Sequence, residues 1–299
     1  MGKPRTDQPP GPRGRWLVGN SYDYDRDRIG FLRRNQARYG DVFSFSPSTV
    51  VVCDPSLIHE IFNRSNEIFL AEAQVLASRR EMIRAEANVE NWMRSRRLGW
   101  QGMTRGVVRA HGRRVVTAFD AALSGTGGEF FDVMALMRVY SGRLVADLLF
   151  GTGADDVVAA ADHRSTLALP FMNTNLTIPK WLPTPGVRRA VRAEDAVEAA
   201  IENHVRQRRA NPHDESEDLL DLLLAEDDPP LEDAHIVQLL ESTMLASLGS
   251  PGAVLAWVVL ELARHPDIRE RVREEAIELL SETGSVTDDN RLPYSKAFI

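Results

Sequence analysis

The feature that most constrains this chain is an uncharged run of 19 residues, Ser242 to Leu260, inside a pattern that predicts a helix over 231–264. Its centre reads MLASLGSPGAVLAW and contains Gly249, Pro251 and Gly252, residue types that weaken or interrupt helices. So long and apolar a helix suits either a membrane span or a protein core. Because the run includes three serines and a threonine, we interpret it as a buried core helix.

At 100° per residue, the small and the bulky side chains of this run fall on opposite faces. The small face comprises Ser242, Ala246, Gly249, Ser250 and Ala253. The bulky face comprises Met244, Leu248, Pro251, Leu255, Val259 and Leu262. Two interpretations of the small face stay open: another helix crosses closely over it, or a flat cofactor lies against it.

Pro251 has a specific consequence inside a helix. It cannot donate a hydrogen bond to the carbonyl of Ser247, four residues earlier, and its ring presses on that turn. We therefore expect a kinked or widened turn with an unpaired Ser247 carbonyl. Ser250 adds a hydroxyl on the small face, so the turn is predicted to hold water or a small diatomic ligand.

The rest of the chain is mostly helical in pattern. VFSFS and TVVVCD predict a hairpin, Pro55 predicts a helix start, and residues 1–20 predict a Pro-rich arm. Besides the helix at Pro55, the expected helices cover roughly 29–39, 74–86, 90–98, 103–123, 130–149, 187–209, 216–225, 231–264 and 267–281. We predict one domain, 1–299, of mainly α class with a small N-terminal β-sheet.

Charge and cysteine usage limit the function. The net charge of −7 does not favour nucleic acid or an anionic membrane. The single cysteine, Cys53, excludes a disulfide framework and a Cys-rich metal site, and we interpret it as a small buried hydrophobe. The N-terminus lacks the apolar core of a signal peptide or membrane anchor. We expect a cytoplasmic protein.

A basic segment runs from Asn91 to Phe119 with seven arginines and no acid. The arginines are Arg94, Arg96, Arg97, Arg105, Arg109, Arg113 and Arg114. This pattern is typical of a solvated helix face, of a docking face for an acidic partner, or of a site for carboxylates or phosphates. Trp92, Arg96 and Trp100 share one helix face, which suits a flat anionic ligand.

The order of several motifs resembles that of a cytochrome P450, a haem-thiolate monooxygenase, of the soluble bacterial type. The motifs are YGDVFSF, VVVCDPSLIHEIF, the Trp-x-x-x-Arg of Trp92 and Arg96, FFDVMALMRVYSGRLVADLLFG, LAWVVLELARHPDIRERVREEA and LPYSKAFI. The resemblance covers the whole chain. It implies the cytochrome P450 fold, a haem cofactor, and insertion of one oxygen atom from O2 into a small apolar organic substrate.

The resemblance also assigns residues. It implies that Trp92 and Arg96 contact the haem propionates, and that the basic face around Arg94–Arg114 receives an acidic electron donor such as a ferredoxin or flavodoxin. The family's Ala-Gly-x-(Asp/Glu)-Thr-Thr motif corresponds to residues 246–251, and Ala246 matches it. Ser250 stands at the oxygen-activating threonine, whereas Gly249 lacks the acid of the proton relay. Water and the Ser247 carbonyl would replace that acid, or oxygen activation is altered or absent.

The largest departure from the family lies after LPYSKAFI, where the Glu-x-x-Arg motif and the haem-ligating cysteine loop would follow. No residue here matches the axial ligand, and the seven histidines form no pair at metal spacing, so we assign no metal ligand. We expect a cytochrome P450 truncated at its C-terminus and inactive by itself, whose parent is a monooxygenase. The alternatives are a haem-less P450-like helper or scaffold for a partner enzyme, or an unrelated helical ligand-binding protein.

Overall fold

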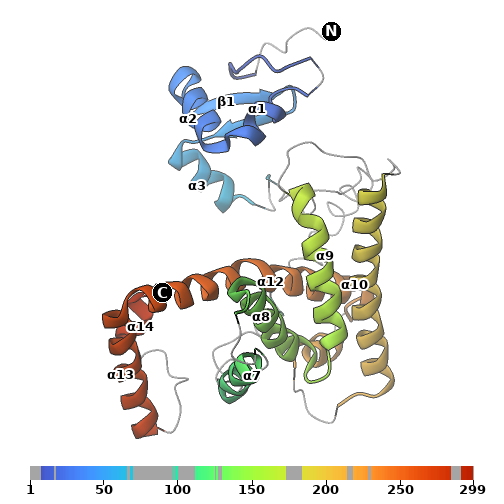
Figure 1. The fold of residues 1–299 in the computed structure, drawn as a ribbon. Coiled ribbons are helices and arrows are strands. Elements are labelled where there is room, and N and C mark those ends of the chain that lie inside the picture. The colour runs from blue at the N-terminus through green and yellow to red at the C-terminus, as the bar shows by residue number, and fades with distance from the viewer. Residues whose placement is uncertain are drawn as a thin grey trace. The chain divides into compact units, whose positions relative to one another are not determined.

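The computed structural model describes residues 8–65 apart from Leu17, then 68–69, 97, 99, 112–124, 126, 130–172, 184–213, 218–227, 230–283 and 291–298. The chain divides into two compact units (Figure 1). The first comprises Met1–Val89 and Leu167–Arg189, and the second comprises Glu90–Thr166 and Ala190–Ile299. The single domain expected over 1–299 stays a prediction.

The first unit contains the N-terminal hairpin. Its elements are α1 (Ser21–Arg26), α2 (Arg28–Tyr39), β1 (Val42–Ser46), β2 (Thr49–Val52) and α3 (Pro55–Asn63). The strands pair antiparallel, with Val42 opposite Val52, which confirms the expected hairpin. Its core is built on Phe31, Phe43 and Phe45, and Cys53 packs partly buried against them. Cys53 therefore packs as a small hydrophobe, although it is less buried than expected.

The described part of the second unit is helical. Its elements are α7 (Gly112–Ser124), α8 (Val133–Phe150), α9 (Asp155–Met172), α10 (Pro185–Ala210), α11 (Leu219–Leu224), α12 (Asp233–Arg264), α13 (Pro266–Thr283) and α14 (Pro293–Phe298), with the ends of α9 and α10 assigned to the first unit. Six of the expected helices correspond to α7, α8, α10, α11, α12 and α13, and of the helix expected over 103–123 the residues 103–111 lie outside the described residues. The expected helix 74–86 and most of 90–98 lie outside the described residues. No helix was expected where α9 lies.

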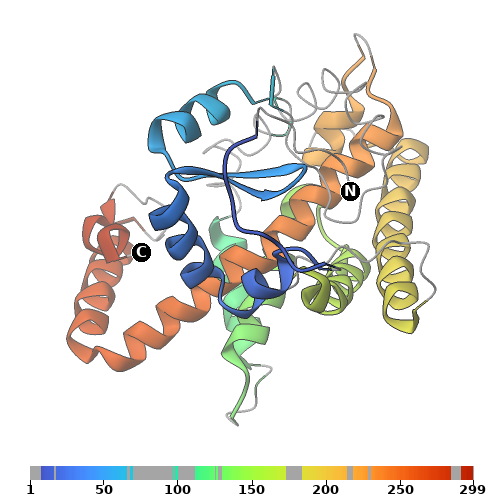
Figure 2. The same cartoon turned by 90° about the horizontal axis from the view of Figure 1, so that it is seen from above.

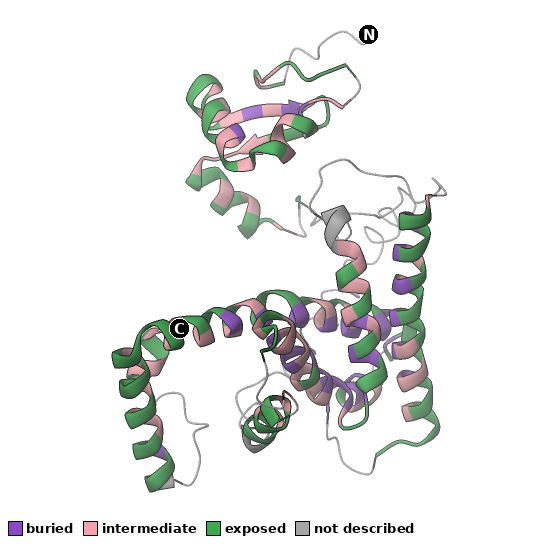
Figure 3. Cartoon of the chain, viewed as in Figure 1, coloured by how far each residue is buried: buried purple, intermediate pink, exposed green. Residues whose placement is uncertain are grey.

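The core of the second unit gathers the inward faces of five helices, α8 to α12. Its fully buried side chains include Leu149, Phe150, Val157, Ile201, Leu220, Ile236, Leu240, Met244 and Leu248. Figure 3 shows burial along α8 and the first half of α12, whereas most of α13 is exposed. In the second half of α12, Gly252 and Ala256 are buried and the other residues are half-buried or exposed. The uncharged run Ser242–Leu260, expected to be a buried core helix, is buried along one side only, at Met244, Ser247, Leu248, Gly252 and Ala256.

By length and composition, α12 is also the one helix among the described residues that could cross a membrane, with 28% of its apolar stretch buried. Such a helix is common in the cores of soluble proteins, so this finding is weak evidence for a span. The absence of a membrane anchor stays a prediction.

Candidate functional site

The helix α12 continues from Asp233 to Arg264 and includes Pro251. Figure 2 shows this long helix in orange along its length. Its two faces differ as expected. Ser242, Ala246, Gly249 and Ser250 are exposed, whereas Met244 and Leu248 are fully buried. Pro251 departs from this pattern, because it is exposed although it was assigned to the bulky face. The small face is therefore accessible in the structure.

The close helix crossing lies on a different side of α12. There α8 passes over Ser247, Gly252 and Ala256, all of them buried. A Cβ added at Gly252 would lie 2.7 Å from Cα of Arg138, and a Cβ at Gly142 would lie 2.5 Å from Cδ2 of Leu248. These glycines let the two helices approach. Within the described residues, the helix-crossing interpretation therefore applies to this side and not to the predicted small face.

The expectation of a free Ser247 carbonyl is wrong. The hydroxyl of Ser141, on α8, donates a hydrogen bond of 2.7 Å to this carbonyl oxygen. Both serines are buried, so the bond replaces the one that Pro251 cannot make. The carbonyl therefore bonds within the protein on the buried side of α12, and it has no proton of its own to give in place of the missing acid.

Residues 242–250 carry four side-chain hydroxyls. Of these, only the Ser250 hydroxyl has no hydrogen-bond partner among the described residues. Ser242 and Thr243 donate to the Leu239 carbonyl at 2.9 and 2.8 Å, and Ser247 donates to the Met244 carbonyl at 2.6 Å. Such bonds back to the helix are the usual fate of hydroxyls within it. The exposed Ser250 hydroxyl is thus available to a ligand.

The space beside Gly249 is open. A Cβ built there would meet no atom within 4 Å. Ala246 and Ser250 leave the adjoining surface low and exposed. The face can accept a flat group, and it has room for the carboxylate that the family carries at position 249. The site therefore lacks the acid because of its sequence and not because of crowding.

The two predicted haem-propionate contacts, Trp92 and Arg96, lie outside the described residues. Of the seven arginines in the basic segment, the structure describes the side chains of Arg97 and Arg114, and both are exposed. Arg114 belongs to α7. The placement of the basic segment as a whole stays a prediction.

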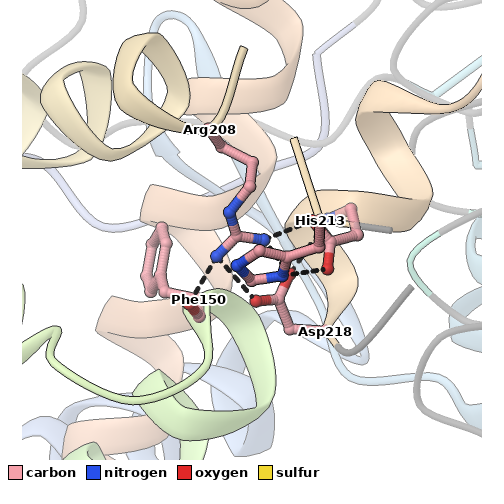
Figure 4. Close-up of polar contacts among 5 residues, drawn as sticks. Phe150, Arg208, His213 and Asp218 are labelled. Carbon is pink, nitrogen blue, oxygen red and sulfur yellow. Dashed lines mark hydrogen bonds and ion pairs between the residues drawn. The ribbon is translucent and has the colours of Figure 1, made fainter. Parts of the chain in front are cut away.

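A second polar group of residues connects α10 and α11 to the end of α8 (Figure 4). Nη1 of Arg208 contacts Asp218 at 3.0 Å and also bonds Asp221, while Nη2 donates to the Phe150 carbonyl at 2.9 Å. Burial acts to lower the pKa of Arg208, but its bonds to the two aspartates outweigh this and raise the pKa above its ordinary value. The arginine therefore stays charged.

Sequence reasoning missed this group, because it considered only pairs of histidines. His213 donates from Nδ1 to Asp221 at 3.0 Å, so that His213, Asp218 and Asp221 present ligand atoms within 4.8 Å of one another. The guanidinium of Arg208 contacts both carboxylates and supplies the positive charge between them (Figure 4). The arrangement is that of a structural ion-pair network.

Comparison with known proteins identifies the family. The cytochrome P450 family model matches residues 9–299, and the chain belongs to that family. A solved structure of retinoic-acid-bound cyanobacterial CYP120A1 superposes with a TM-score of 0.75, covering 97% of this chain and 67% of that one at 21% identity. This likeness confirms the expected fold, mainly helical with a small β-sheet.

Curated relatives are distant in sequence. The cyclooctat-9-en-7-ol 5-monooxygenase of Streptomyces melanosporofaciens is 25% identical over an alignment of 306 positions that covers 95% of this chain and 64% of that protein. The isoflavone 3'-hydroxylase of Medicago truncatula is 24% identical over an alignment of 339 positions that covers 97% of this chain and 66% of that protein. The chain thus spans just under two-thirds of the length of these relatives.

Membership of a haem-binding family makes haem the expected cofactor, and the structure allows a test of fit. Among the described residues, nothing covers the face of Ala246, Gly249 and Ser250, which is flat enough for a ring and offers one hydroxyl without a partner there. These residues fit the oxygen side of a haem. The single cysteine, Cys53, packs against the aromatic core of the first unit, so this chain's fit to haem rests on α12.

Proposed function

We propose that this chain belongs to a haem-dependent monooxygenase that inserts one oxygen atom from O2 into a small apolar organic molecule. One observation carries the proposal: the cytochrome P450 match covers a long helix with an exposed small-residue face, on which the Ser250 hydroxyl has no partner among the described residues. The names of two relatives, a monooxygenase and a hydroxylase of organic compounds, support the reaction class.

Haem, when bound, supplies the activation of O2. The residues of this chain then have separate tasks. Ala246 and Gly249 leave room for a flat ring, and Ser250 Oγ can hold and pass a proton next to it. No carboxylate stands at position 249, and Ser141 occupies the Ser247 carbonyl. Proton delivery on this face therefore depends on Ser250 and on water. In other enzymes, a positioned acid raises the reaction rate by about 10²–10⁴-fold.

We further propose that an acidic electron donor, a ferredoxin or flavodoxin, docks on the basic face around Arg94–Arg114, and that the protein works in the cytoplasm. The exposure of Arg97 and Arg114 supports the first part. The single cysteine supports the second, because cysteine-poor chains without disulfides suit a reducing compartment. Because the overall charge is negative, this basic segment offers an acidic partner its most favourable docking face.

The proposal is tested on the protein encoded by the complete reading frame to which this sequence belongs. The purified protein is reduced and treated with carbon monoxide, and its absorption spectrum is recorded. We expect retained haem with the Soret band of a thiolate-ligated iron. A protein that takes up no haem would contradict the proposal and would favour a haem-less helper of a partner enzyme.

A further inference from the structure

The turn of α12 that precedes Pro251 is held from outside the helix. Pro251 has no N–H, so the Ser247 carbonyl has lost its ordinary partner within the helix. Ser247 is buried, and water cannot easily replace that partner. A buried carbonyl in this position needs a donor from a neighbouring element.

Ser141 is that donor. Its side chain lies in the α8–α12 crossing, and its Oγ is 2.7 Å from the carbonyl oxygen of Ser247. Gly142 follows it directly, and Gly252 packs on the backbone of α8. A short side chain can span the gap because these two glycines bring the backbones together. The donor and the close crossing therefore belong to one arrangement.

The same turn carries the candidate site on its other side. Ser247 faces the crossing and is buried, while Gly249 and Ser250 are exposed on the small face. The position of the Ser250 hydroxyl depends on the backbone of residues 247–251. In an uninterrupted helix the i to i−4 hydrogen bond would fix this backbone. Here the hydroxyl of Ser141 takes over that task.

We propose that Ser141 is a positioning residue, which holds the proline-containing turn of α12 and so places the Ser250 hydroxyl on the oxygen side of the site. The inference rests on the proposed function only for the role of Ser250. The hydrogen bond and its effect on the turn can be measured in the 299-residue chain without haem. Failure of one part can therefore be distinguished from failure of the other.

The first experiment is a double-mutant cycle with Ser141→Ala and Pro251→Ala, read by amide hydrogen exchange in residues 248–254. Exchange in α10 serves as the internal reference for global unfolding. With Pro251 present, Ser141→Ala should speed local exchange at least about fivefold, because it leaves a buried carbonyl unpaired. In the Pro251→Ala background, the new backbone N–H at position 251 can reach the Ser247 carbonyl, so the same change should have little effect. An equal effect in both backgrounds, or none in either, would overturn the proposal.

Ser247→Ala is the matched control. It removes a buried hydroxyl from the same turn, one that bonds the Met244 carbonyl, and leaves the Ser247 carbonyl in place. We expect a smaller effect on exchange than from Ser141→Ala. If Ser141→Ala does not fold, the double variant with Pro251→Ala must fold again, because an alanine at position 251 restores the bond within the helix. A double variant that also fails would equally overturn the proposal.

The second experiment uses the haem-loaded protein of the complete reading frame. The C–O stretching frequency of its reduced carbon-monoxide complex reports polar groups near the bound gas. Ser141→Ala should shift or broaden this band, and Ser247→Ala should not. An unchanged band together with faster exchange would mean that Ser141 stabilises the turn but does not position the Ser250 hydroxyl, which would overturn that part of the proposal. Altered exchange without any haem uptake would instead locate the failure in the proposed function.

Discussion

Gly252 packs directly on the backbone of Arg138, and a Cβ at residue 252 would lie 2.7 Å from Cα of Arg138. Gly249, three residues earlier on the same helix, has no atom within 4 Å of the corresponding point. The two glycines of one helix therefore serve different purposes. Gly252 permits the crossing with α8, and Gly249 leaves the small face open.

This difference predicts opposite effects of the same substitution. Gly252→Ala should lower the free energy of unfolding by about 1–3 kcal/mol, because the crossing is overpacked. Gly249→Ala should raise it by about 0.5–1 kcal/mol, because alanine is the better helix former and meets no neighbour. Urea denaturation of the two variants measures both values. Equal effects would show that the crossing is not as close as described.

The ion-pair network of α10 and α11 predicts a large loss from a single substitution. The side chain of Arg208 is 11% exposed and that of Asp218 is fully buried. Arg208→Met should cost about 3–5 kcal/mol, because it leaves buried carboxylates unpaired. The control is the neighbouring Arg209→Met, whose pair with the exposed Asp233 should contribute at most about 1 kcal/mol. Denaturant unfolding that finds the two variants equally stable would contradict the network's role.

The attachment of α14 to α13 should depend on pH. Glu275 accepts hydrogen bonds from the Tyr294 and Ser295 amides, both at 2.8 Å, and from the Ser295 hydroxyl at 2.6 Å. Desolvation acts to raise the pKa of Glu275, but these bonds outweigh it and hold the pKa below its ordinary value. Because the folded-state pKa is depressed, the stabilisation is present above the unfolded-state pKa and is lost as pH falls through the folded-state pKa.

Amide exchange of Tyr294 and Ser295 at decreasing pH, corrected for intrinsic rates, measures this attachment. We expect protection to fall through the folded-state pKa of Glu275, and Glu275→Gln to remove it at neutral pH. Glu274→Gln, at the exposed neighbouring position, is the control and should leave protection unchanged. Protection that does not vary with pH in the wild-type chain would disprove the role of Glu275.

Much of the fold could be predicted from the sequence, because long helices with one apolar face have a clear period. The long helix α12 is an example. Pro55 marked the start of α3, where the structure adds a cap in which Asp54 accepts from the Leu57 amide. By contrast, α9 was not expected. Its sequence places Pro170 near the end and mixes apolar and polar residues, so its buried Val157 and Ala161 depend on tertiary packing.

The site was predictable only in part, for a physical reason. The spacing of Ala246, Gly249 and Ser250 sets their common face within one helix, and the structure shows that face exposed. The partner of the Ser247 carbonyl lies 106 residues away in sequence, and no local pattern indicates it. The network of Arg208 likewise joins three elements. Contacts between elements decide which polar groups stay free, and periodicity does not report them.

Arg96 provides a test of the cofactor assignment that depends on the family motif. If Arg96 binds a haem propionate, Arg96→Ala should increase the rate of haem loss from the protein of the complete reading frame. The adjacent Arg97, which is exposed, supplies the control Arg97→Ala. Haem transfer to an excess of apomyoglobin, followed by absorbance, measures the rate. Equal rates in the two variants would contradict the propionate contact and favour the interpretation that Arg96 lies on a solvated helix face.

The central claim is that the small face of α12 is the oxygen side of a haem site. It is tested most directly by the C–O stretching frequency of the reduced carbon-monoxide complex in wild type, Ser250→Ala and Ser242→Ala. Both variants lose an exposed hydroxyl from the same face, but the Ser242 hydroxyl already bonds the Leu239 carbonyl. The account predicts a shifted band for Ser250→Ala and an unchanged band for Ser242→Ala. Identical bands in all three proteins would contradict it.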